Sequence, residues 1–236
     1  MGAPGRFGQG ILAALVGAAL LSCTADPSRK PGSGGPGGSG GHGGPGGSGD
    51  PVGALDASAP RPPKANTLYS MARIMVSRSR DADAETILAK LIAEHPDFLP
   101  AYADLAELYL RHDHPDSAVL VLESGLQVAP KDAVLWNDLG MCRLQQKRYE
   151  DAVDGFTKAA AGVPHDARSR ANLAVALGML GRLEESLAVY LQVVSPAEAH
   201  HNLGVLCQAR GDAARAEQEY AAAEALSAKS DGSSNP

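Results

Sequence analysis

The sequence predicts an all-α fold in which about five helical hairpins stack into a solenoid behind a disordered tether. Three prolines, Pro96, Pro130 and Pro164, follow one another at intervals of 34 residues. Small and large side chains recur in phase with these prolines from about residue 66 to residue 228. A repeat of this period indicates supersecondary units that bury their apolar surface only when they stack on one another.

The composition favours a domain of packed helices and argues against one class of partner, the nucleic acids. Most of the 27 glycines and 16 prolines precede residue 66, which leaves roughly 160 residues for one folded domain. The aromatic share is only 4%, and small side chains suit close contact between helices better than a β-sandwich. The formal net charge of −6 argues against a nucleic-acid partner, which requires clustered Lys and Arg.

The first 22 residues are predicted to be a signal peptide. Residues 11–21 form an uncharged apolar run that is too short to cross a bilayer, which takes about 20 apolar residues. The run ends in Leu20-Leu21-Ser22-Cys23, which resembles the lipobox of bacterial lipoproteins. This resemblance implies that Cys23 becomes an acylated N-terminus that holds the protein on the lipid bilayer. An ordinary secretory signal without lipid remains the alternative.

Residues 23–65 are predicted to be a disordered linker, and residues 229–236 a disordered tail. The linker contains repeated Gly-Gly-Pro-Gly-Gly-Ser-Gly units, which cannot bury enough apolar surface to offset their ordering entropy. A flexible coil of about 40 residues has a root-mean-square span of roughly 35 Å. The linker would therefore hold the folded domain away from the membrane.

The residue after the cysteine is Thr24, where an Asp would resemble an inner-membrane retention signal. This residue favours an outer-membrane lipoprotein that faces the periplasm.

Five units can be aligned by counting positions from the first residue of each. The units begin at Ala65, Leu99, Ala133, Ala167 and Ala197, the last after a contraction. Position 8 is always small, namely Ala72, Ala106, Gly140, Ala174 and Gly204. Position 20 is also always small, and position 24 is always large, namely Leu88, Leu122, Phe156, Tyr190 and Tyr220. Position 7 is Met71, Leu105, Leu139, Leu173 and Leu203, and we expect it to lie on the buried stripe of each first helix.

This register resembles the tetratricopeptide repeat, whose pattern is W-x2-L-G-x2-Y, then A-x3-F, then P. The third unit carries Trp136, Leu139, Gly140, Ala152, Phe156 and Pro164. It departs from the pattern at Arg143, which replaces the usual tyrosine, and the fourth unit is shortened because Pro196 comes early. The resemblance implies a superhelix of hairpins over residues 66–228 that binds a protein or peptide partner. Gly181 and Gly211 follow first helices, where a left-handed residue is expected.

The resemblance places the ligand on the concave side, which the first helices line. Position 6 is polar in all five units, and an Asn there can both donate to and accept from a peptide backbone. We expect the peptide-binding groove to be lined by Asp104, Glu107, Arg111, Asn137, Asp138, Met141, Gln145, Arg168, Asn172, His201 and Asn202. The alternative for Asn172 and Asn202 is that they satisfy neighbouring groups of the protein itself.

Features that suggest chemistry are few. Cys142 and Cys207 fall in units three and five, so we expect them too far apart for a disulfide and buried as small apolar groups. His112, His114 and Asp116 lie at a turn, where polarity explains them better than a metal site. No nucleophile sits in an activating motif. The sequence therefore predicts no catalysis, no cofactor and no metal.

These observations predict a membrane-anchored adaptor of the bacterial cell envelope. Resemblance to small envelope repeat lipoproteins suggests assembly of a pilus or a secretion machine as its setting. Recruitment of peptidoglycan-processing enzymes and outer-membrane biogenesis are alternatives, as is a secreted repeat protein that carries no lipid.

Overall fold

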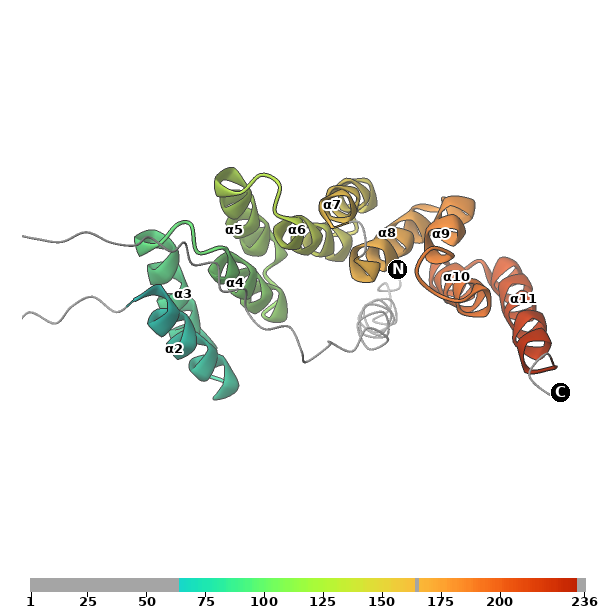
Figure 1. Cartoon of the computed structure of the whole chain (residues 1–236), viewed down its shortest axis with the longest axis horizontal. Helices are drawn as coiled ribbons and strands as arrows, with labels where there is room; N and C mark the ends of the chain where they lie inside the picture. Colours follow the sequence, from blue (N-terminus) through green and yellow to red (C-terminus); the bar gives the residue numbers. More distant parts are fainter. Residues whose placement is uncertain (1–63, 164–165, 233–236) are drawn as a thin grey trace, which may run out of the picture.

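The computed structural model describes residues 64–163 and 166–232, and these residues form ten α-helices and no strand. The helices pair in chain order into five hairpins that follow one another in an extended row (Figure 1). Their bounds are α2 Ala65–Ser77, α3 Asp81–Glu94, α4 Leu99–Arg111, α5 Pro115–Val128, α6 Ala133–Gln145, α7 Tyr149–Gly162, α8 Ala167–Leu180, α9 Leu183–Tyr190, α10 Pro196–Arg210 and α11 Ala213–Gly232. The predicted all-α solenoid of five hairpins is confirmed, whereas the leader, Cys23 and the linker up to residue 63 lie outside the described residues.

The helix boundaries follow the register of the sequence closely. The first helices α2, α4, α6 and α8 begin where the first four units begin. The fifth begins at Pro196, one residue before the expected start, because Ser195 and Glu198 form a reciprocal capping box around it. At the other end α11 continues to Gly232, beyond the predicted domain end at residue 228.

Position 15 adopts the left-handed conformation in every hairpin. Gly181 and Gly211 have φ of 94° and 86°, as expected. The residues Ser79, Asp113 and Lys147 occupy the same position with φ of 56°, 60° and 61°. The turn requires this conformation because the next backbone N–H bonds back to a carbonyl in the last turn of the first helix, as in the 2.8 Å bond from Arg148 N to Arg143 O. Only the two glycines were visible in the sequence, since the other units use residues that tolerate this conformation less well.

Positions 8 and 24 face each other inside the hairpins. A Cβ added to Gly140 would lie 2.7 Å from the Phe156 ring, and one added to Gly204 would lie 2.7 Å from the Tyr220 ring. Units one and two instead combine Ala72 or Ala106 with a buried leucine at position 24. A larger residue on one helix is thus matched by a smaller residue on the other, as close packing requires. Unit four is the exception, with Ala174 and Tyr190 both buried.

The shortened fourth unit changes the packing of its successor. Helix α9 has only 8 residues, and residues 191–195 lead directly into α10. Helix α10 still contacts both helices of the preceding hairpin, α8 and α9, as α6 and α8 do with theirs. A Cβ added to Gly178 of α8 would lie 2.5 Å from Cδ1 of Leu206 of α10, so the two helices approach very closely. The predicted contraction is therefore absorbed without a break in the row.

Position 7 is buried only where a preceding hairpin covers it. Leu105, Leu139 and Leu203 are buried and Leu173 is half-buried, but Met71 of α2 is 43% exposed. The prediction that Met71 lies on a buried stripe was wrong. The physical reason is that this stripe is covered by the second helix of the previous hairpin, and no helix precedes α2 among the described residues.

A buried ion-pair cluster attaches the last helix. Glu219 of α11 is buried, and its carboxylate accepts bonds of 2.7 Å from His200 Nδ1 of α10 and from Arg215 Nε. This arrangement satisfies a carboxylate that would otherwise be costly to bury. Helix α11 has no successor in the described chain and closes the row, as expected for a capping helix (Figure 1).

Replacing Gly140 with Ala should destabilise the third hairpin, because the added methyl group meets the Phe156 ring. We expect a loss of about 1–3 kcal/mol in the free energy of unfolding. Combining Gly140→Ala with Phe156→Leu restores the Ala–Leu pairing of the first two units and should recover part of the loss. A double-mutant cycle measured by urea denaturation tests this, and additive effects of the two substitutions would contradict the proposed contact.

Candidate functional site

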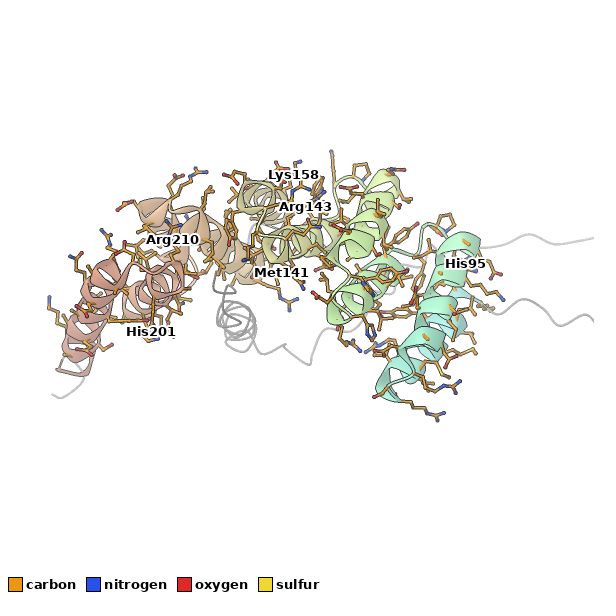
Figure 2. All side chains as sticks on the ribbon, turned by 180° about the vertical axis from the view of Figure 1, so that it is seen from behind. His95, Met141, Arg143, Lys158, His201 and Arg210 are labelled. Carbon is orange, nitrogen blue, oxygen red and sulfur yellow. The ribbon has the colours of Figure 1, made fainter. Side chains whose placement is uncertain are left out.

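The first helices line the inner side of the solenoid. Helix α4 contacts α6, α6 contacts α8, and α8 contacts α10 directly. We call this surface the inner face. It consists of positions 2, 5, 6, 9 and 13 of the first helices α2, α4, α6, α8 and α10. Figure 2 shows Met141 and His201 along one edge of the molecule and Lys158 and Arg143 along the opposite edge.

The predicted groove residues occupy the inner face at different depths. Asn137 and Asn172 are buried, and Asp104, Asp138, Met141 and Asn202 are half-buried. The exposed members are Glu107, Arg111, Gln145, Arg168 and His201. The inner face therefore presents exposed charged and amide side chains together with half-buried polar and apolar ones.

Asn137 and Asn172 form a bridge between α6 and α8. The Asn172 amide Nδ2 donates to Asn137 Oδ1 at 2.9 Å, and both side chains are at most 7% exposed. The Asn137 amide in turn donates to Asp138 Oδ1 at 3.2 Å. Two of the predicted groove residues, at position 5 of α6 and position 6 of α8, thus bond to each other beneath the inner face. The sequence analysis left open the alternative that Asn172 bonds to the protein itself and not to a ligand. The structure agrees with this alternative, and the partner comes from another helix.

Asp138 is a carboxyl group in a poorly solvated position. Burial raises its pKa to about 6, against the lowering effects of the Asn137 hydrogen bond and the Arg168 charge. The negative charge of Glu107 raises it further. A carboxyl group of this kind changes its protonation state near pH 6, so it can donate a hydrogen bond below that pH and only accepts hydrogen bonds above it.

Asp104 and Tyr69 form a second polar group at the start of the inner face. Burial raises the pKa of Asp104, which the hydrogen bond with the Tyr69 hydroxyl lowers and the charge of Glu107 raises. The pKa of Tyr69 rises to about 12 through burial and the charge of Asp104. Tyr69 was not among the predicted groove residues. It stands at position 5, the position of Asn137 and His201, so the register itself contained the signal.

Arg111 lies between the inner face and the preceding hairpin. Its guanidinium is 3.2 Å from Glu107 Oε1 and 3.5 Å from Asp81 Oδ1 of α3. His112 Nε2 lies 2.9 Å from Asp81 Oδ2. His112 therefore joins two hairpins. Within the described ranges, no group of three or more His, Cys, Asp or Glu is arranged to hold a metal ion.

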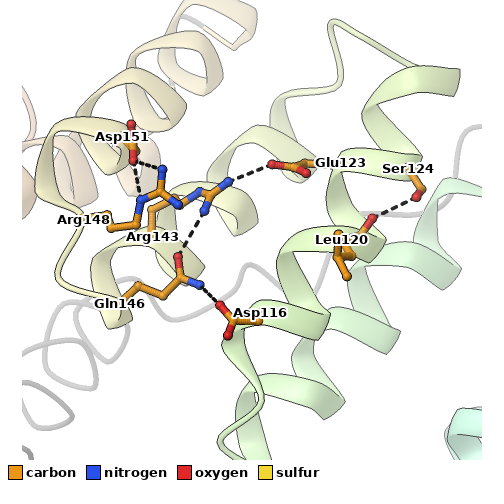
Figure 3. A network of polar contacts seen from close by, with 8 residues as sticks. All are labelled: Asp116, Leu120, Glu123, Ser124, Arg143, Gln146, Arg148 and Asp151. Atoms are coloured by element: carbon orange, nitrogen blue, oxygen red, sulfur yellow. Dashed lines mark hydrogen bonds and ion pairs between the residues drawn. The ribbon is translucent and has the colours of Figure 1, made fainter.

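A cavity of about 410 Å³ lies on the other side of α6, between α5 and α7. It is lined by Glu123, Leu126, Gln127, Trp136, Leu139, Arg143, Arg148, Asp151 and Asp154. Arg143, which replaces the usual tyrosine, contacts Glu123 at 2.8 Å and Gln146 at 3.2 Å, and Gln146 continues to Asp116 at 2.6 Å (Figure 3). The arginine thus joins α6 to α5 through polar contacts where the repeat pattern has an aromatic ring.

The two cysteines of the domain are inert. Cys142 and Cys207 are free and fully buried, as the sequence predicted. Burial raises the pKa of Cys142 to about 12, so its thiolate is not available as a nucleophile.

In the part of the chain that the structure describes, no helix has the length and apolar character needed to cross a membrane.

The described residues form an α-solenoid of helical hairpins whose first helices line the inner face. The family model of the tetratricopeptide repeat matches residues 61–142. This match covers 82 of the 236 residues and agrees with the tetratricopeptide-repeat resemblance of the sequence, and helical hairpins in the same register continue beyond it to α11.

Curated relatives match only a short part of their own length. The peroxisomal targeting signal receptor of Saccharomyces cerevisiae is 33% identical over 98 residues, which cover 42% of this chain and 16% of the receptor. The human superkiller complex protein 3 is 31% identical over 90 residues, which cover 38% of this chain and 6% of that protein. The chain thus spans about a sixth or less of these relatives.

Solved structures share the fold at low sequence identity. A MamA protein has a TM-score of 0.58 at 15% identity, covering 73% of this chain and 96% of that one. YrrB, described as a tetratricopeptide-repeat protein with an unusual peptide-binding site, has a TM-score of 0.55 at 19% identity, covering 68% and 84%. The pilF protein of Pseudomonas aeruginosa has a TM-score of 0.54 at 18% identity, covering 68% and 75%.

Asn172→Ala should destabilise the domain, because it leaves the buried Asn137 Oδ1 without its donor. We expect a loss of about 1–3 kcal/mol in the free energy of unfolding. The matched control is Asn202→Ala, at the same position of the fifth unit but only half-buried, which should change stability by less than about 0.5 kcal/mol. Equal effects of the two substitutions in urea denaturation would argue against a special role for the bridge.

Asp138→Asn should stabilise the domain at neutral pH. The folded-state pKa of about 6 lies above the ordinary aspartate value of 3.8, so the folded state binds the proton more tightly and loses stability as the pH rises from about 4 to about 6. This difference in pKa lowers the free energy of unfolding by about 3 kcal/mol at pH 7. We therefore expect the stability of the wild type relative to Asp138→Asn to fall over this pH range and to be constant above pH 7. A difference that is independent of pH in urea denaturation would contradict the raised pKa.

Proposed function

We propose that the protein is an adaptor of the bacterial cell envelope whose inner face captures an extended segment of a partner protein. The observation that carries this proposal is the inner face itself. Position 6 has a polar side chain on each first helix, and position 9 lies one turn away. On α6, α8 and α10 position 9 is apolar, with Met141 and Val205 half-buried and Val175 buried. Alternating polar and apolar groups suit a peptide whose backbone and side chains are both recognised.

The buried bridge defines which groups are available for this capture. Asn137 and Asn172 hold α6 and α8 in register, whereas Gln145, Arg168 and His201 are exposed beside them. A surface that is organised before binding loses less conformational entropy when the ligand is captured. The similarity to YrrB, described as having a peptide-binding site, supports a peptide ligand.

Attachment to the membrane is the second part of the proposal. Cys23 would carry the acyl chains, and the Gly-rich linker would let the domain reach partners away from the outer membrane. The fold similarity to pilF of Pseudomonas aeruginosa supports pilus assembly as the setting. The proposed activity is binding and not catalysis.

Photo-crosslinking in native cells tests the binding surface. An unnatural crosslinking residue at Gln145 on the inner face should yield one dominant adduct, identified by mass spectrometry. The matched control is Leu120, which is 66% exposed on the second helix α5 and should yield no such adduct. In a parallel arm, Cys23→Ser should abolish acyl labelling and release the protein from the membrane fraction. Equal adducts from both positions would disprove capture by the inner face, and unchanged membrane association would disprove the lipid anchor alone.

A further inference from the structure

The cavity between α5 and α7 has an apolar floor and a polar rim. Its volume of about 410 Å³ is within the range of roughly 300–1,000 Å³ that is usual for small-molecule sites. Leu126 of α5 and Leu139 of α6 contribute the apolar floor, and Trp136 contributes an aromatic wall. Charged side chains and the amide of Gln127 surround this floor. We call this space the α6 cavity.

The α6 cavity lies where the third unit departs from the repeat pattern. In the second unit position 11 is Tyr109, whose ring packs against the buried clusters on both sides of α4. The Tyr109 hydroxyl donates to Glu85 Oε1 at 2.7 Å. Position 11 of the third unit is Arg143, whose guanidinium extends to Glu123 and Gln146. The space beside α6 therefore lacks the aromatic ring that the second unit supplies from its own chain.

The charges around the α6 cavity are compensated in pairs. Each of three cations has a carboxylate partner, namely Arg143 with Glu123, Arg148 with Asp151 and Lys158 with Asp154. A charged ligand would have to compete with one of these pairs, whereas an uncharged ring can occupy the apolar floor between them. A second ring also packs favourably against Trp136, because aromatic pairs gain more than their buried area provides. The cavity therefore favours an uncharged aromatic group.

The backbone that carries such a ring has a partner at the rim. The Gln127 amide makes no hydrogen bond to any residue that the structure describes. An amide side chain can both donate to a backbone carbonyl and accept from a backbone N–H. The floor and rim together suit an aromatic residue within a polypeptide.

The aromatic group has to come from a different protein. Residues 1–63 contain a single Phe, Trp or Tyr, which is Phe7 in the predicted signal peptide. Residues 164–165 and 233–236 contain none. Every Phe, Trp and Tyr among the described residues is buried or half-buried, so a second copy of the chain offers no exposed ring.

We propose that the α6 cavity binds an aromatic side chain of a partner protein, which takes the place that Tyr109 occupies in the second unit. The ring rests on Leu126 and Leu139 beside Trp136, and Gln127 bonds to the backbone next to it. A buried aromatic anchor inside a polar rim is typical of the centre of a protein interface. Arg143 and Lys158 lie along the edge opposite to Met141, so the site is separate from the inner face (Figure 2). The inference therefore does not depend on peptide capture by the inner face.

Tryptophan fluorescence tests the proposal, because Trp136 is the only tryptophan of the chain and lines the cavity. The chain carrying Cys23→Ser, which has no acyl group to bind an apolar probe, is titrated with N-acetyl-phenylalaninamide. We expect a saturable change in emission with a dissociation constant in the millimolar range, as for a fragment of about 15 non-hydrogen atoms. N-acetyl-leucinamide should bind at least about threefold more weakly, since it lacks the ring contact with Trp136.

Two substitutions of Arg143 separate the filling of the cavity from the loss of the guanidinium. Arg143→Tyr restores the residue of the repeat pattern, so its ring should fill the cavity and raise the dissociation constant at least about tenfold. Arg143→Ala leaves the cavity open and should keep the dissociation constant within about threefold of the wild-type value. The matched control is Arg78→Tyr, at an exposed arginine directly after α2, which should bind the probe as the wild type does. Cooperative unfolding in urea verifies that each variant is folded.

Three results would overturn the proposal. The first is the absence of a saturable change with N-acetyl-phenylalaninamide up to about 10 mM. The second is equal affinity for the phenylalanine and leucine probes, a comparison that needs no variant and is decisive even if Arg143→Tyr does not fold. The third is equal affinity of Arg143→Tyr and Arg143→Ala for the probe, which would show that filling the cavity has no effect on binding.

Discussion

The structure depends on the burial of each first helix between two second helices, its own and that of the preceding hairpin. A single hairpin has an apolar stripe on both sides of its first helix and can cover only one of them. Positions 8 and 24 close the hairpin internally, through pairs such as Gly140 with Phe156. Positions 3, 7 and 10 join it to its neighbour. The second contact builds the row, and its absence at α2 leaves Met71 and Ile74 exposed.

The same stacking creates the inner face. Because successive first helices contact one another directly, residues that are 34 or 35 positions apart in the chain meet in space, as Asn137 and Asn172 do. The close contact also removes solvent from the carboxyl groups at position 6 and raises the pKa of Asp104 and Asp138. Some polar residues of the inner face are therefore structural, and only the others remain free for the proposed capture of a ligand.

Departures from the repeat pattern are accommodated locally. Arg143 replaces an aromatic ring but bonds to Glu123 of the preceding hairpin, so that the connection between α5 and α6 is polar at this point (Figure 3). The shortened α9 is followed by a capped helix that starts at Pro196 and packs on α8 and α9 together. Both changes keep the row continuous because each hairpin interacts only with its neighbours.

The sequence by itself determined the helical hairpins, their register and almost all of their boundaries. These features depend on local periodicity, on small and large residues in fixed positions, and on capping residues such as Gly181 and Gly211. The left-handed turns at Ser79, Asp113 and Lys147 escaped notice because their identities do not indicate a positive φ.

Only the tertiary structure decided the depth and partners of the inner-face residues. Whether an Asn at position 6 is offered to a ligand or bonded to the preceding hairpin depends on how closely two helices approach, and the Asn172–Asn137 bridge could not be read from either residue alone. The exposure of Met71 was missed for the same reason, since its pattern matches the buried leucines of later units and only its neighbour differs. Periodicity specifies which side of a helix is apolar, but contact with another hairpin decides whether that side is buried.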